Sequence, residues 1–200
     1  MPEKVKKKNN GKEFENHFKS SCENTSFWCE RFADSNKFGM NSMTRFTTNS
    51  PADFLLFDHS TGLFYLELKS TEGNSLSVET EAPIKPPRRK KGEPKPEYKP
   101  KKSYMIKYHQ LEGLTIRNSY DKMYGVVLFH FITSDSYYWM FASEIIPLAL
   151  KLDKKSINEK DIKENGKTID TFRVKKKVLL DIEKLVIDIS LSKNYVQKRD

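Results

Sequence analysis

The sequence predicts an α/β fold with a mixed central β-sheet flanked by helices. Segments with the apolar spacing of helices alternate with short apolar runs typical of strands, in the order helix, three strands, helix, two strands, helix. The 200 residues fit one domain with one sizeable core, and no internal repeat is visible. We therefore expect a single folded domain over residues 11–200, preceded by a basic arm at residues 1–10.

The first expected elements are a helix at about 11–21 and a strand at 25–32. Within the helix, Phe14 and Phe18 are four residues apart, which places both rings on one face. The strand segment is rich in aromatic and other strand-favouring residues. The stretch 34–50 that follows is polar, and we expect it to be a loop.

A hairpin is predicted next, from two apolar runs at 54–57 and 63–66 with turn-forming residues at 58–62 between them. Both runs are apolar on both faces, as expected for interior strands of a covered sheet. Because side chains alternate along a strand, Glu67 and Lys69 project from one face at the end of the second run. Such charges are costly to bury and need a partner or a metal.

The next stretch of chain is basic and rich in proline. Between residues 83 and 102, nine Lys or Arg stand against two acids, and six prolines exclude a helix or an interior strand. We expect a mobile, extended insertion at about 75–103 that emerges beside Lys69 and contacts phosphates. The alternative interpretations are a solvated linker and a basic tract of the localisation type.

The remaining elements follow the same two patterns: a helix at 105–120, strands at 125–131 and 136–141, and a helix at about 142–152. Pro147 is compatible with the last helix only through a kink or an early end. Residues 154–200 alternate charged linkers with a mixed segment at 178–189, whose type the sequence leaves open.

Charge and composition narrow the classes of function. A net charge of +9 favours a polyanionic partner such as nucleic acid, although it also serves solubility. The two cysteines form no CxxC pair, so we expect ordinary reduced thiols and no structural zinc. No apolar stretch of about 18 residues is present, and the basic start is followed by no apolar region, which predicts a cytoplasmic protein without a membrane span.

One constellation carries chemistry. Asp53, from the strand preceding Glu67 and Lys69, puts two carboxylates and an ammonium group within reach of each other. The arrangement resembles the PD-(D/E)xK nuclease signature, although these three residues alone are equally well explained as salt-bridging residues at a strand end. The helix containing Phe14-Glu15 is similar to the N-terminal helix of Holliday-junction resolvases in that superfamily. Residues 109–114 resemble their His-Gln or Gln-x-x-Gly element, and the RecU type is the closest match.

The resemblance implies a restriction-endonuclease-like core and a metal-dependent active site. Asp53 and Glu67 would hold Mg²⁺, with Mn²⁺ able to substitute, and Glu15 would supply a third carboxylate. Lys69 would orient the attacking water or neutralise the developing charge. Gln110 would place a water or a metal-bound phosphate.

The implied activity is that of an endonuclease that resolves four-way DNA junctions by paired nicks in recombination and repair, acting as a homodimer on a two-fold symmetric substrate. We expect the basic segments and one loop arginine to contact the DNA, through Lys6, Lys7, Lys8, Arg45, Arg88, Arg89, Lys90 and Lys91.

One departure from the RecU pattern concerns substrate choice. RecU-type proteins usually carry a long basic projection between the first strand and the catalytic Asp, whereas here the interval 34–50 is short and nearly uncharged, and the basic insertion follows Lys69 instead. Two alternatives therefore remain open: a restriction-like or repair nuclease that acts on duplex or flapped DNA, and a non-catalytic basic protein that binds nucleic acid.

Overall fold

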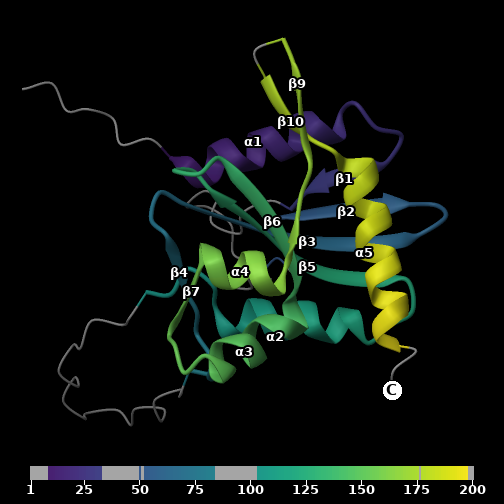
Figure 1. The fold of residues 1–200 in the computed structure, drawn as a ribbon. Helices are drawn as coiled ribbons and strands as arrows, with labels where there is room; N and C mark the ends of the chain where they lie inside the picture. The colour runs from purple at the N-terminus through teal and green to yellow at the C-terminus, as the bar shows by residue number, and fades with distance from the viewer. Residues whose placement is uncertain (1–8, 33–49, 51, 84–102, 176, 198–200) are drawn as a thin grey trace, which may run out of the picture.

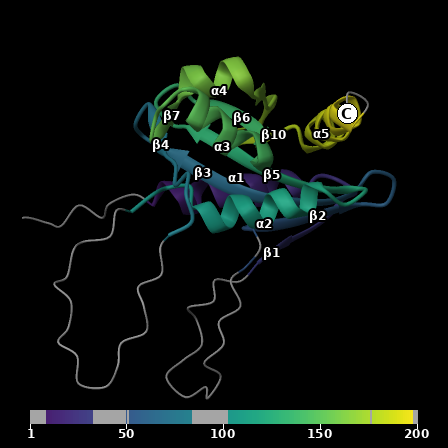
Figure 2. The same ribbon diagram turned by 90° about the horizontal axis from the view of Figure 1, so that it is seen from below.

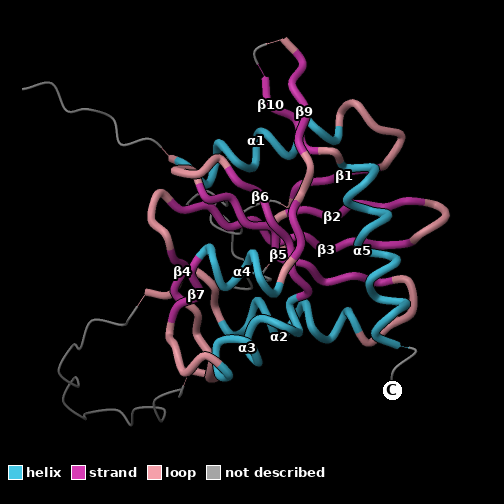
Figure 3. Tube along the Cα trace, in the orientation of Figure 1, coloured by secondary structure: helices cyan, strands magenta, loops and turns pink. Residues whose placement is uncertain are grey.

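The computed structural model describes residues 9–32, 50, 52–83, 103–175 and 177–197 (Figure 1). In this described part, a six-stranded sheet with the order β1-β2-β3-β5-β6-β8 crosses the centre of the molecule, with helices around it (Figure 3). The elements are α1 Asn10–Cys22, β1 Trp28–Arg31, β2 Phe54–Asp58, β3 Gly62–Thr71, β4 Ser75–Ser77, α2 Tyr108–Asn118, β5 Met123–Phe131, β6 Ser136–Phe141, α3 Ala142–Lys151, β7 Ser156–Asn158, α4 Glu159–Asn165, β8 Lys167–Thr168, β9 Thr171–Val174, β10 Lys177–Leu180 and α5 Ile182–Gln197.

The six-stranded sheet of the described residues is mixed. Strands β3 and β5 are parallel neighbours, whereas its other neighbouring strands pair antiparallel. Between β3 and β5 the chain passes through β4 and α2, as a parallel pair requires a long crossover. The prediction of an α/β fold with a mixed central sheet flanked by helices is confirmed.

The two faces of the sheet each bury a hydrophobic core, and helices cover both (Figures 1 and 2). On one face Phe64, Leu66 and Leu68 of β3 pack with α1 and α5, and we call this the α1/α5 core. On the other face residues such as Val127 of β5 and Met140 of β6 pack with α2, α3 and α4, and we call this the α2/α3 core. Alternation along each strand thus decides which helices a side chain meets.

Helix α1 forms where the apolar spacing predicts it. Phe14 and Phe18 are fully buried in the α1/α5 core. Strand β1 is shorter than the expected 25–32, because the residues before it make a turn. In that turn the Thr25 hydroxyl and backbone N–H both donate to the carbonyl of Cys22, at 2.8 and 3.0 Å.

The predicted hairpin is present, with Phe54 opposite Leu66 and Asp58 opposite Gly62. Asp58 accepts the backbone N–H groups of the turn, as a turn-forming Asp does. Gly62 has φ of +121°, and a Cβ there would lie 2.2 Å from the carbonyl oxygen of Lys122. This position therefore requires glycine, both for its backbone conformation and for the close approach of the chain before β5.

The expected insertion at about 75–103 begins later than the composition suggested. Leu76 of β4 and the following Val78 are fully buried, and Val78 pairs with Ile106 in an isolated bridge. Strand β4 also pairs antiparallel with β7. Both ends of the segment are therefore fixed to the domain, and residues 84–102 lie outside the described part of the chain.

Helices α2 and α3 lie close to their expected places. The first begins at Tyr108 rather than at residue 105, because Ile106 hydrogen-bonds to the backbone beside β4. The second runs through Pro147 to Lys151, so the proline does not end it early. Its apolar side, including Ile145, is buried in the α2/α3 core, which stabilises the helix despite the missing N–H.

The segment 178–189, whose type the sequence left open, holds the end of one strand and the start of a helix. Strand β10 pairs with β9, and α5 follows at Ile182 and packs in the α1/α5 core. Upstream, the short strand β8 extends the main sheet beyond β6, with Lys167 opposite Trp139. None of the helices in the described ranges combines the length and the apolarity needed to span a membrane.

Candidate active site

Strand β3 presents Glu67 and Lys69 on the same face of the sheet, where Lys69 Nζ lies 2.6 Å from Glu67 Oε1. The residue between them, Leu68, packs on the opposite face in the α1/α5 core. Glu67 is only 3% exposed. A carboxylate at that depth is stable in its charged form only with partners, and Lys69 is the first of them.

Asp53 enters the site from the residue before β2. Its backbone N–H donates to Leu66 O at 3.1 Å and its carbonyl accepts from Phe32 N at 2.9 Å, so its backbone is held between β3 and the end of β1. The side-chain Oδ2 accepts the N–H of Leu68 at 2.7 Å. Asp53 therefore faces Glu67 across two neighbouring strands.

The electrostatics show that the two carboxylates are close. Burial, and then the charge of Glu67, raise the pKa of Asp53 to about 7, and Glu15 adds a smaller effect in the same direction. The N–H of Leu68 and the ammonium group of Lys69 act in the other direction and lower the pKa of Asp53, which reduces the total increase. When one carboxylate raises the pKa of another, the two negative charges repel each other. A bound cation would reduce that repulsion.

Helix α2 places Gln110 beside the carboxylate of Glu67. Gln110 Nε2 donates to Glu67 Oε1 at 2.5 Å, while Gln110 Oε1 accepts the backbone N–H of Lys107 at 3.3 Å. The start of the helix is held by Glu79, whose Oε2 accepts the N–H of Tyr108 at 3.0 Å. An acid at a helix N-terminus is electrostatically favourable. Glu79 was not singled out from the sequence, because its partner is 29 residues away.

Glu15 of α1 lies near this group but is bound elsewhere. Its Oε2 accepts both Nε and an Nη of Arg31 at 2.7 Å, so β1 and α1 are joined by an ion pair. Arg31 was not predicted as a site residue. The two residues are 16 positions apart, and only the packing of α1 beside β1 reveals the pair.

The described residues contain no cluster of three His, Cys, Asp or Glu side chains arranged to hold a metal ion. The pair of carboxylates nevertheless has the chemistry of a partial magnesium site, because hydrogen bonds to described residues occupy Asp53 Oδ2 and Glu67 Oε1 and leave one oxygen of each carboxylate to bind a cation. Glu15, the expected third carboxylate, has its Oε2 paired with Arg31. The structure thus brings Asp53, Glu67, Lys69 and Gln110 together.

Eight residues are expected to contact DNA. All lie outside the described ranges: Lys6, Lys7, Lys8, Arg45, Arg88, Arg89, Lys90 and Lys91. Pro51, part of the motif around Asp53, also lies outside them.

No known protein family matches this chain, and no curated protein is detectably similar to it.

Proposed function

We propose that this chain is a Mg²⁺-dependent endonuclease with a restriction-endonuclease-like core, and that its substrate is branched DNA of the four-way-junction type. The observation that carries the proposal is the pair of carboxylates, Asp53 and Glu67, held on adjacent strands with the Lys69 ammonium group 2.6 Å from Glu67. A buried Glu67 with the partly buried Asp53 and Lys69 beside it suits hydrolysis of a phosphodiester better than it suits stability, since buried charges seldom stabilise a fold.

Each residue has a distinct task in the proposed reaction. A bound divalent ion would lower the pKa of water and stabilise charge on the phosphate. Asp53 and Glu67 would hold that ion through their free oxygens. Lys69, a compact point charge, would orient the attacking water and neutralise the developing negative charge. Gln110 fixes the rotamer of Glu67 through its 2.5 Å hydrogen bond, and its amide is near enough to place a water or a phosphate oxygen.

The proposed substrate and assembly rest on the RecU resemblance and on charge. The net charge of +9 suits a polyanion, and the segment 83–102, which follows β3 and β4 in the sequence, carries nine Lys or Arg against two acids. Two copies related by two-fold symmetry would place two sites on the paired strands of a junction. We therefore propose a homodimer that makes paired nicks.

The direct test replaces each of the three central residues. Asp53→Ala, Glu67→Gln and Lys69→Ala should each lower Mg²⁺-dependent nicking of a labelled four-way junction by about 10²-fold or more, as removal of catalytic groups commonly does. Junction binding in a gel-shift assay should be largely unchanged. Glu112→Gln, an exposed acid on α2, is the matched control and should cleave normally. Full cleavage by any of the three variants would overturn the assignment.

Substrate choice separates the proposal from its alternatives. A junction and a linear duplex of the same sequence are incubated with the protein and Mg²⁺. Preferential cleavage of the junction supports the resolvase, and equal or better cleavage of duplex or flapped DNA supports a restriction-like or repair nuclease. Binding without Mg²⁺- or Mn²⁺-dependent hydrolysis of any of these substrates supports a non-catalytic binding protein.

A further inference from the structure

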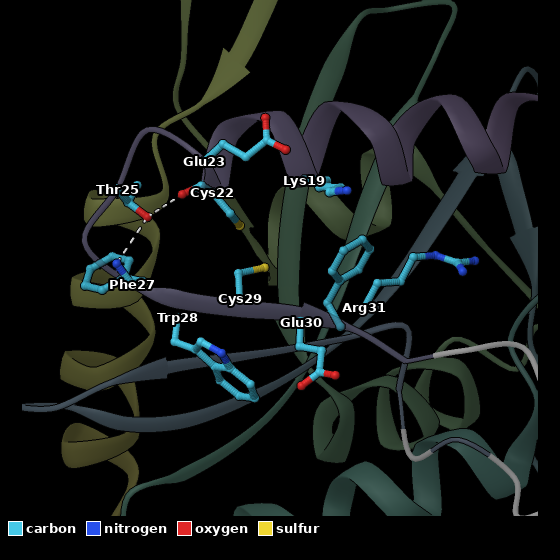
Figure 4. A pocket seen from close by; sticks show the side chains of 10 residues that line it. Lys19, Cys22, Glu23, Thr25, Phe27, Trp28, Cys29, Glu30 and Arg31 are labelled. Atoms are coloured by element: carbon cyan, nitrogen blue, oxygen red, sulfur yellow. Dashed lines mark hydrogen bonds between the residues drawn. The ribbon is translucent and has the colours of Figure 1, made fainter.

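Cys22 and Cys29 are the two cysteines of the whole chain, and the fold brings their side chains together. Cys22 ends α1, and Cys29 is the second residue of β1. Figure 4 shows the two sulfur atoms turned toward one another in the space between this helix and this strand. A turn containing Thr25, which hydrogen-bonds to the Cys22 carbonyl, returns the chain between them. Their separation of seven residues gave no motif in the sequence.

The thiols lie at a pocket of about 480 Å³. Cys22 is buried, with 4% of its surface exposed, whereas Cys29 is only partly buried. Lys19, Glu23 and Glu30 also line the pocket, together with the apolar Phe27 and Trp28 (Figure 4). A small reagent can therefore approach Cys29, while Cys22 is reached through its neighbour.

The environment gives the two thiols different reactivities. A hydrogen bond from Cys22 lowers the pKa of Cys29, assisted by the ammonium group of Lys19 and opposed by burial. The same contact, together with burial, raises the pKa of Cys22. Because the thiolate is the reactive form, Cys29 is the thiol that reacts with an electrophile and Cys22 stays protonated beside it.

We propose that Cys22 and Cys29 are an oxidisable dithiol, a modification site at which a hydroperoxide converts the pair into an intramolecular disulfide between α1 and β1. This inference uses only the geometry of the two thiols and does not depend on the proposed nuclease activity.

The proposed reaction has two balanced steps. The Cys29 thiolate attacks the terminal peroxide oxygen, the O–O bond breaks, and protonation of the leaving oxygen gives a Cys29 sulfenic acid and, from hydrogen peroxide, water. The Cys22 sulfur then attacks the Cys29 sulfur, and its proton leaves with the hydroxide as a second water. Two electrons pass from the two thiols to the peroxide, and a dithiol reductant reverses the change.

Binding of a thiophilic metal ion by Cys22 and Cys29 fits the structure less well than disulfide formation. Glu23 and Glu30 line the same pocket, yet the described residues contain no set of three metal-ligating side chains. Two thiols without further ligands do not make the tetrahedral site that Zn²⁺ prefers. Two sulfur atoms that face one another are instead what formation of a disulfide requires (Figure 4).

The test uses the intact wild-type protein. After treatment with hydrogen peroxide and removal of the excess, a thiol reagent should find no free thiol, and the monomer should lose the mass of two hydrogen atoms. Peptide mapping should recover the fragments of Cys22 and Cys29 linked to one another. Dithiothreitol should restore both thiols. The oxidised form should also melt higher by about 5 °C, since the crosslink closes a short loop and restricts the unfolded chain.

Single variants distinguish the two roles. In Cys22→Ala, Cys29 should still react and stop at a sulfenic acid that a 1,3-dione probe traps, whereas wild type should show little trapping. In Cys29→Ser, Cys22 should resist the same peroxide concentration. Two free thiols in treated wild type, a disulfide linking two separate chains, or equal trapping in wild type and Cys22→Ala would overturn the proposal. The wild-type measurement decides the question even if a variant fails to fold.

Discussion

At the scale of single residues, the candidate site depends most on Glu67. Its carboxylate is almost fully buried, and its Oε1 accepts both Lys69 Nζ and Gln110 Nε2. Asp53 lies beside it with a pKa of about 7, raised by burial and by this neighbour. A fold selected for stability alone gains little from such a group, because the desolvation of buried charges offsets much of their attraction.

Arg31 is paired with Oε2 of Glu15, the proposed third ligand. We expect Arg31→Ala to tighten Mn²⁺ binding several-fold, because it releases Glu15 and removes a positive charge near the cation. Isothermal titration calorimetry or Mn²⁺ electron paramagnetic resonance measures this without requiring activity. Loss of the partly exposed pair should cost less than about 1 kcal/mol of stability.

A double variant separates the two causes. Arg31→Ala combined with Glu15→Gln keeps the charge removal but deletes the ligand. If Glu15 binds the cation, the double variant should lose most of the gain in affinity. Unchanged or weaker Mn²⁺ binding in the single variant would remove Glu15 from the ligand set.

His130 predicts a pH dependence of stability. It stacks on Tyr137 at 4.2 Å and packs against Phe14, and burial lowers its pKa. Asp135, Glu13 and His17 face the ring, and the two acids oppose the shift without reversing it. Because the folded pKa is depressed, the stabilisation is present above the unfolded pKa of 6.5 and is lost as pH falls through the folded value.

Urea unfolding at several pH values tests this prediction. The free energy of unfolding of wild type should fall more steeply between about pH 7 and pH 5 than that of His130→Phe, which retains an aromatic ring in the stack but has no proton to bind. Parallel curves for the two proteins would show that His130 does not contribute to the pH dependence.

At the scale of elements, the position of α2 decides where Gln110 lies. Glu79 holds the helix start, and Gly125 allows β5 to approach the middle of the helix. A Cβ at Gly125 would lie 2.1 Å from the carbonyl oxygen of Leu114, which no flexible side chain can relieve. The absence of a side chain at Gly125 therefore allows α2 to pack closely against β5.

We expect Gly125→Ala to lower the free energy of unfolding by about 1–3 kcal/mol, through overpacking between β5 and α2. Thermal or urea denaturation measures the change. The matched control is Gly113→Ala on α2, where the nearest neighbour is the far end of Arg117 at 3.6 Å, and which should stabilise the helix by about 0.5–1 kcal/mol. Equal stability of Gly125→Ala and wild type would contradict the packing argument.

At the scale of the whole molecule, the positive charge is concentrated outside the described core. The segment 83–102 carries nine Lys or Arg and two acids, within a chain of net charge +9. The described residues hold 18 Lys or Arg and 22 Asp or Glu, so the part of the chain that contains the sheet and its two cores has a net charge of −4. Affinity for DNA and the chemistry of cleavage are thus expected to lie in different parts of the chain, so that each can be removed separately.

We expect neutral replacement of four of these basic residues to weaken junction binding and to lower the slope of log affinity against log salt concentration by about 3–4 units, roughly one for each phosphate that is no longer neutralised. Fluorescence anisotropy at several salt concentrations measures both; the replaced residues are Arg88, Arg89, Lys90 and Lys91. A control set replaces exposed lysines elsewhere and should leave the slope nearly unchanged: Lys151, Lys155, Lys160 and Lys163. Similar losses in both sets would mean that binding is not localised to the insertion.

The helices and strands with a clear apolar period were predictable from the sequence. Phe14 and Phe18, four residues apart, are both buried as the helical period predicts. The hairpin runs bury alternate residues, such as Phe54 and Leu56, whereas Phe57 is 40% exposed, so the expectation that both faces of these strands are covered holds only in part. The segments 75–78 and 178–189 were not predictable in the same way. They are short, and each is stabilised by a partner far along the chain, such as β7 for Leu76.

By itself, the sequence indicated that Glu67 and Lys69 share one face of a strand, because side chains alternate along a strand, and that a short hairpin brings Asp53 beside them. Only the tertiary structure decided that Gln110 hydrogen-bonds to Glu67, that Arg31 forms an ion pair with Glu15, and that the sulfur atoms of Cys22 and Cys29 face one another. These contacts join residues on separate elements. Their distances depend on how helices pack against the sheet, which no local pattern in the chain records.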